Sequence, residues 1–89
     1  MADLEKIKKR MAEIGSGPKN VTLSEIEWVV DRLKERGHRV TKREATHGKL
    51  FSVDGQRFMV NYHNPGNGQV KPYSVKDFLN AMSELGLYE

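Results

Sequence analysis

The chain has 89 residues, of which 15 are Lys or Arg and 12 are Asp or Glu, so its formal net charge is +3. This length suits one small domain and excludes a large enzyme with a deep substrate cleft. The absence of cysteine excludes disulfides, thiolate chemistry and a cysteine-based zinc site. The charged first segment and the lack of roughly 18 consecutive apolar residues predict a cytoplasmic protein that does not enter a membrane.

Two helices are predicted in the first part of the chain. The first covers residues 4–14, where apolar residues recur at helical spacing, and it stops at the breaker run "GSGP". We interpret residues 1–20 as a helical arm with its linker, which either packs on the rest of the domain or frays. Residues 20–37 predict the first main helix, with Thr22 and Glu25 as a candidate capping box and Gly37 as its end.

After Gly37 the apolar period changes from helical to alternating. Residues 38–42 predict a short strand, and residues 49–53 and 56–62 predict a hairpin joined by Asp54-Gly55, a pair that suits a type I′ turn. That turn pairs Phe51 with Phe58. The face that carries these two phenylalanines is the predicted core face, and both main helices should cover it.

The last element is a helix over residues 74–86, with Ser74 and Asp77 as a capping-box-like pair, and residues 64–72 before it are predicted to form a loop. The predicted fold class is α+β, with the order α-β-β-β-α, a three-stranded antiparallel sheet, two helices on one face and the added N-terminal arm. This is the architecture of double-stranded RNA-binding domains, but a fold alone gives only a prior on function.

Basic residues are concentrated in residues 34–49, where the only acidic residues are two glutamates. Arg39, Lys42 and Arg43 are candidate contacts to the RNA backbone, which give affinity without sequence choice. Lys71 is a further candidate, because the N-terminus of the last helix favours anions. The alternative is structural: charged side chains on an edge strand are solvated and prevent aggregation.

His47 is the candidate catalytic residue, because imidazole titrates near neutral pH and can accept the proton of a ribose 2′-hydroxyl. Lys49 could stabilise the charge of the phosphorane, and His63 could be a second proton-transfer group or a phosphate contact. Pleat parity points the two histidines to opposite faces unless a bulge occurs at Gly48. The alternative for each is a solvated polar side chain. The histidine spacing does not suit a zinc site, so neither a metal nor another cofactor is predicted.

Residues 15–40, a histidine at the start of a strand, a hairpin, and above all the run "VKPYSVKDFL" resemble the HicA or YcfA-like toxin family. The resemblance implies that residues 21–89 form a HicA-like RNA-binding domain and that the protein is a toxin of a toxin-antitoxin pair. It further implies metal-independent endonuclease cleavage of mRNA by His47 and a HicB-like antitoxin protein as partner.

One departure from the family pattern keeps two alternatives open. In family members, the four-residue run that ends at the catalytic histidine begins with Gly-Ser. In this chain the corresponding run is Glu44-Ala45-Thr46-His47, so Glu and Ala replace the Gly-Ser pair. The first alternative is an RNA-binding module that has lost catalysis. The second is a protein-interaction domain with a partner surface formed by Met11, Trp28 and Met59.

Overall fold

The computed structural model describes residues 4–17, 20–46, 48–62 and 68–88. Its elements are α1 (Leu4–Ser16), α2 (Leu23–Glu35), β1 (Val40–Ala45), β2 (Gly48–Val53), β3 (Gln56–Asn61) and α3 (Pro72–Glu84). The strands form one antiparallel sheet in the order β1-β2-β3. The α+β class, the element order and the N-terminal helical arm are therefore confirmed.

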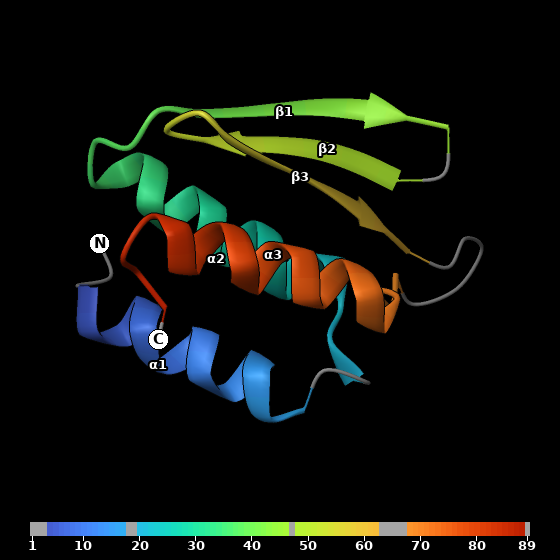
Figure 1. The fold of residues 1–89 in the computed structure, drawn as a ribbon, viewed down its shortest axis with the longest axis horizontal. Helices are drawn as coiled ribbons and strands as arrows, with labels where there is room; N and C mark the ends of the chain where they lie inside the picture. Colours follow the sequence, from blue (N-terminus) through green and yellow to red (C-terminus); the bar gives the residue numbers. More distant parts are fainter. Residues whose placement is uncertain (1–3, 18–19, 47, 63–67, 89) are drawn as a thin grey trace.

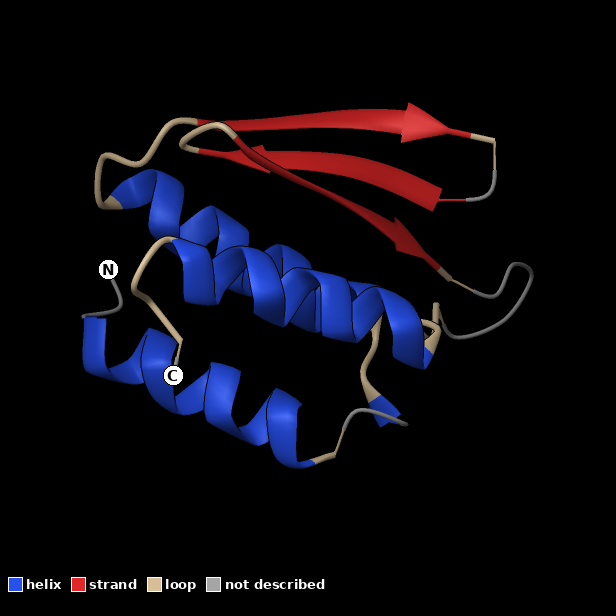
Figure 2. Cartoon of the chain, viewed as in Figure 1, coloured by secondary structure: helices blue, strands red, loops and turns tan. Residues whose placement is uncertain are grey.

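The molecule has three layers (Figures 1 and 2). The sheet forms the first, α2 and α3 lie side by side on one face of it, and α1 packs on the side of these helices that is turned away from the sheet. The arm does not fray: Ile7, Met11 and Ile14 are at most 1% exposed and belong to the same apolar cluster as the residues beneath the sheet. No helix in the described part of the chain is long and apolar enough to cross a membrane.

The hairpin follows the predicted turn chemistry. Asp54 and Gly55 have φ values of 49° and 89°, as a type I′ turn requires, and Phe51 pairs with Phe58 across the strands. The two rings stack with centroids 5.4 Å apart, and Phe78 of α3 packs edge-on against Phe58, also at 5.4 Å. The predicted core face is thus the face that the helices cover.

The two helix starts depart from the predicted caps. Thr22 is the N-cap of α2, but its side chain makes no capping hydrogen bond. α3 begins at Pro72, with Lys71 as N-cap, so Ser74 lies within its first turn and is not its cap. Ser74 is fully buried, and its hydroxyl accepts a hydrogen bond of 2.9 Å from the backbone N–H of Asn61. This serine therefore fixes α3 to the end of β3, a tertiary role that the local pattern does not reveal.

Candidate nucleic-acid interface

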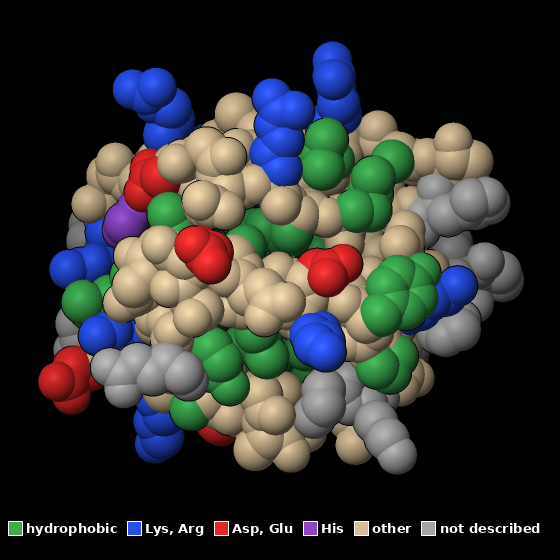
Figure 3. Space-filling view, viewed as in Figure 1, with side chains coloured by type: hydrophobic (Ala, Val, Ile, Leu, Met, Phe, Trp, Pro, Cys, Tyr) green, Lys and Arg blue, Asp and Glu red, His purple; other side chains and the backbone are tan. Residues whose placement is uncertain are grey.

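The outer face of the sheet carries no helix. Strand alternation and the observed register place Arg43 beside Leu50 and Met59 on this face, and Arg57 beside Ser52. Arg39 precedes β1 and lines the same side with Thr41 and Ser52. Lys and Arg side chains project beyond the sheet in Figure 3. No Asp or Glu occupies an outward position of the three strands, which are described over residues 40–45, 48–53 and 56–61.

Arg43 and Arg57 border a shallow hollow on this outer face, together with Thr41, Leu50 and Ser52. Arg43 and Arg57 form no salt bridge or side-chain hydrogen bond within the described residues. Their guanidinium groups are therefore available to an anion, and their planar donor geometry matches a phosphate.

Lys42 and Lys49 lie on the other side of the sheet and turn towards α2. Lys42 Nζ is 2.6 Å from Asp31 Oδ1 and 3.7 Å from Glu27 Oε2. Lys49 Nζ is 3.1 Å from the same Glu27 oxygen and 3.5 Å from Glu44 Oε1. The structure thus separates the predicted basic residues into two groups, of which only Arg39 and Arg43 face the open side of the sheet.

The environment of Lys49 keeps its side chain charged. The hydrogen bond with Glu27 raises the pKa of Lys49 above its ordinary value of 10.5; partial burial lowers it, and the charges of Glu27 and Glu44 raise it further. An ammonium group in this state can stabilise negative charge but is a poor proton donor at neutral pH. A phosphate at Lys49 would also have to compete with two carboxylates.

Residues around the β1–β2 connection meet the start of α3 at one end of the sheet. Gly48, which follows His47 in the sequence, pairs with Asn61. The Asn61 carbonyl accepts a hydrogen bond of 2.9 Å from the backbone N–H of Lys71, and its side-chain amide donates one of 3.0 Å to the Tyr73 hydroxyl. The predicted cation Lys71 therefore lies near the residue that follows the predicted catalyst.

Gly48 fits tightly at this end, because a methyl group added to it would collide with the Val60 carbonyl oxygen and lie 3.0 Å from Asn61 Oδ1. Its pairs with Ala45 and Asn61 continue the regular register, so there is no bulge at Gly48. The bulge that would have brought His47 and His63 to one face is therefore not present at the predicted position. His47 and His63 themselves lie outside the described residues.

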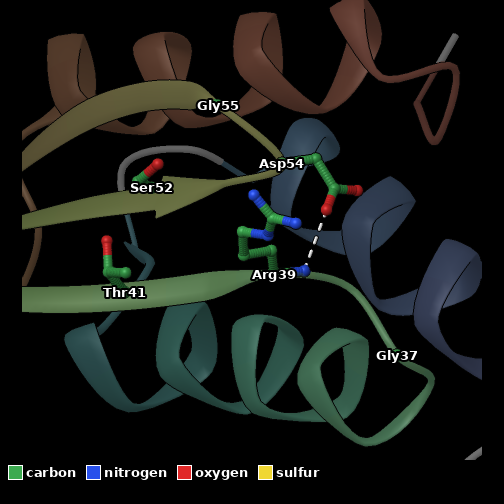
Figure 4. A pocket seen from close by; sticks show the side chains of 6 residues that line it. All are labelled: Gly37, Arg39, Thr41, Ser52, Asp54 and Gly55. Carbon is green, nitrogen blue, oxygen red and sulfur yellow. Dashed lines mark hydrogen bonds between the residues drawn. The ribbon is translucent and has the colours of Figure 1, made fainter.

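The opposite end of the sheet is held by Asp54. Its Oδ1 accepts a hydrogen bond of 2.8 Å from the Arg39 backbone N–H (Figure 4). Its Oδ2 lies 2.6 Å from His38 Nδ1. These contacts tie the β2–β3 turn to the start of β1. The hydrogen bonds from His38 and Arg39 lower the pKa of Asp54 below its ordinary value of 3.8.

Asp54→Asn should lower the free energy of unfolding at pH 7 by less than about 1 kcal/mol, because the pair is largely exposed. A depressed folded-state pKa means that the carboxylate stabilises the fold fully above its unfolded-state pKa, and that this contribution is lost as pH falls through the folded-state pKa. Urea titrations of both proteins should therefore show a difference at neutral pH that shrinks below about pH 4. A difference that grows with acidification would contradict this role.

Sequence reasoning missed three features of these surfaces. Arg57 was not recognised as a phosphate contact, although its position opposite Ser52 on the outer face follows from the turn. Tyr73 was not recognised as a candidate contact, although it is 54% exposed. Glu27 and Asp31 pair with lysines of two strands, Lys42 of β1 and Lys49 of β2, and no local sequence signal predicts these pairs. Within the described residues, no cluster of three or more His, Asp or Glu side chains could hold a metal ion.

Comparisons with known proteins identify no relative: no family model, curated protein or solved structure matches the chain.

Proposed function

We propose that this protein binds RNA on the outer face of its sheet and cleaves it as a HicA-like mRNA endonuclease in the cytoplasm. The open sheet face is the observation that supports RNA binding. It presents Arg39, Arg43 and Arg57, and none of the outward positions in the described strands is Asp or Glu. Phosphate contacts supply most of the affinity of proteins for nucleic acids, so such a face suits an RNA backbone.

Two further features support an RNA ligand. Leu50 and Met59 are half-buried between the arginines and can pack against sugars or bases. Tyr73 stands exposed beside Lys71 at the start of α3, and an exposed aromatic ring next to a cation can stack on an unpaired base.

The cleavage part of the proposal rests on the resemblance of the sequence to the family and on the position of His47 in the connection from β1 to β2. In this mechanism His47 takes the proton of a 2′-hydroxyl, whose oxygen attacks the adjacent phosphorus and displaces the 5′-oxygen of the next nucleotide, and that oxygen takes up a proton from water to become a 5′-hydroxyl. No metal ion is required, and Lys49 has no part in this proposed step, because it lies on the helix side of the sheet and pairs with Glu27 and Glu44. A HicB-like antitoxin protein would then be the partner that restrains this activity.

The second predicted alternative, an interaction domain built on Met11, Trp28 and Met59, is not favoured. Met11 is fully buried in the core, and Trp28 is partly covered by the Arg10 guanidinium, which lies 4.8 Å from the ring centroid. Met59 lies on the outer sheet face, away from both.

Arg43→Ala/Arg57→Ala should weaken RNA binding and reduce the slope of log affinity against log salt by about 1.4 to 1.8, the value for two lost phosphate contacts. Lys42→Ala/Lys49→Ala is the matched control, because it removes the same charge from the same sheet but from the side that faces the helices. Fluorescence anisotropy with a labelled RNA hairpin across a salt series measures both quantities. An equal loss in the two double variants would contradict the outer face as the RNA site.

A further inference from the structure

The outer edge of β3 is an unpaired sheet edge, because β3 is the last strand of the sheet and pairs only with β2. In a hairpin with a two-residue turn, hydrogen-bonded pairs alternate with non-bonded pairs, starting with a bonded pair beside the turn. Gln56 and Phe58 therefore direct their backbone groups to β2, while Arg57, Met59 and Asn61 direct theirs outward.

Asn61 supports this assignment, since its N–H donates to Ser74 Oγ at 2.9 Å and its carbonyl accepts from the Lys71 N–H at 2.9 Å. The outward N–H and C=O of Arg57 and Met59 make no such bond with any residue in the described ranges. A short stretch of strand thus presents free donors and acceptors at a fixed spacing.

A groove runs along this stretch, between residues 56–59 and α3, with a cavity volume of about 330 Å³. Its helix wall consists of Asp77, Asn80, Ala81 and Glu84, which recur at helical spacing on one side of α3. Ala81 leaves room beside the strand because its side chain is small. Acidic side chains are visible along α3 in Figure 3, on the face where this groove opens.

The groove has a negative wall. Neither Asp77 nor Glu84 forms a salt bridge with any residue that the structure describes. Seven residues of helix separate these carboxylates by about 10 Å along the axis. Alternate side chains of a bound strand recur every 6.6 Å or so, and the side chains of Lys and Arg are long enough to reach both carboxylates from alternate positions.

We propose that this groove binds an extended, basic peptide segment of another protein, which adds to the sheet as a fourth strand beside β3. The main-chain groups of Arg57 and Met59 would supply the backbone hydrogen bonds, and Asp77 and Glu84 would select Lys or Arg at alternate positions. The β1 edge lacks these features, because its charged side chains Lys42, Arg43 and Glu44 oppose edge pairing.

A basic partner fits this site better than a second copy of the chain. A second β3 would bring only one cation, Arg57, to the two carboxylates, whereas a segment with Lys or Arg at alternate positions brings one to each. The inference goes beyond the proposed function: it uses the backbone of Arg57 and Met59, whose side chains belong to the proposed RNA face, and it involves neither Arg43 nor His47. Its failure would leave RNA binding and cleavage untouched.

The test uses two eight-residue probe peptides, alternating Lys-Val and alternating Glu-Val, titrated into the ¹⁵N-labelled full chain. We expect the lysine peptide to shift and protect the amides of Arg57 and Met59, and the glutamate peptide to leave them unchanged. Met59→Pro should abolish binding, since it removes an outward N–H without removing a bond to β2. Equal binding of both peptides, or shifts confined to other elements, would overturn the proposal.

Asp77→Lys/Glu84→Lys provides a second variant in case the proline disturbs the strand, and it should weaken lysine-peptide binding at least about fivefold. Glu5→Lys/Glu13→Lys makes the same change in net charge on α1, so it should retain most of the affinity. Equal losses in these two variants would show that only net charge matters and would overturn the site. Concentration-dependent dimerisation through Arg57 and Met59 without peptide would replace the basic partner by a second copy.

Discussion

His47→Ala should slow RNA cleavage by about 10²- to 10⁴-fold, the usual contribution of a positioned proton-transfer group. RNA affinity should change little, because the proposed phosphate contacts are Arg39, Arg43 and Arg57. The fold should persist, since the apolar core is formed by other residues. Single-turnover cleavage of a labelled RNA, binding measurements and thermal melts of both proteins separate these effects.

His38→Ala is the matched control for this variant. His38 is the histidine that pairs with Asp54 at the other end of the sheet, so its replacement should leave the cleavage rate near that of the wild type. If the proposed toxin function is correct, growth arrest of a host cell by the wild-type chain should be lost with His47→Ala, although the variant should still bind the proposed antitoxin. A His47→Ala protein that cleaves at the wild-type rate would remove the catalytic assignment.

Phe58→Ala should lower the free energy of unfolding by about 3 to 5 kcal/mol, the usual cost of deleting a buried phenylalanine. Phe58 is 4% exposed and lies between Phe51 of β2 and Phe78 of α3, so its loss opens a cavity where the sheet meets the helix. A domain of this length has a total stability of roughly 4 to 13 kcal/mol. The variant should therefore unfold at a clearly lower urea concentration than the wild type.

Met59→Ala controls for this effect, because Met59 is the next residue of β3 and points to the open face of the sheet. It should cost much less than Phe58→Ala, and it should not remove the cooperative transition. Urea unfolding followed by circular dichroism compares the two proteins with the wild type. A similar loss in both variants would contradict the assignment of the inner and outer faces.

The sequence predicted most of the fold because its local signals agree with one another. Asp54-Gly55 specifies a two-residue turn, the turn specifies the register, and the register assigns every residue of β2 and β3 to a face. Gly37 and Gly86 end their helices with φ values of 99° and 76°, which suit glycine. These features depend on neighbours in the chain, which a sequence displays directly.

The candidate site was harder to predict from the sequence, because it depends on contacts between distant segments. The sequence presents Lys42 and Arg43 as equivalent cations, whereas one is turned to Asp31 and Glu27 of α2 and the other to the open face. Ser74 has the appearance of a cap but accepts a hydrogen bond from β3. Such assignments follow from the packing of α2 and α3 on the sheet, which no local pattern encodes.

The most direct test of the proposed function is incubation of the purified wild-type chain with a folded mRNA in the presence of EDTA, followed by analysis of the fragment ends. The mechanism predicts salt-sensitive binding and fragments that carry 5′-hydroxyl ends, because the 2′-oxygen attacks and the 5′-oxygen leaves. RNA that remains intact under conditions of saturated binding, or cleavage that appears only when a divalent metal is restored, would contradict the account.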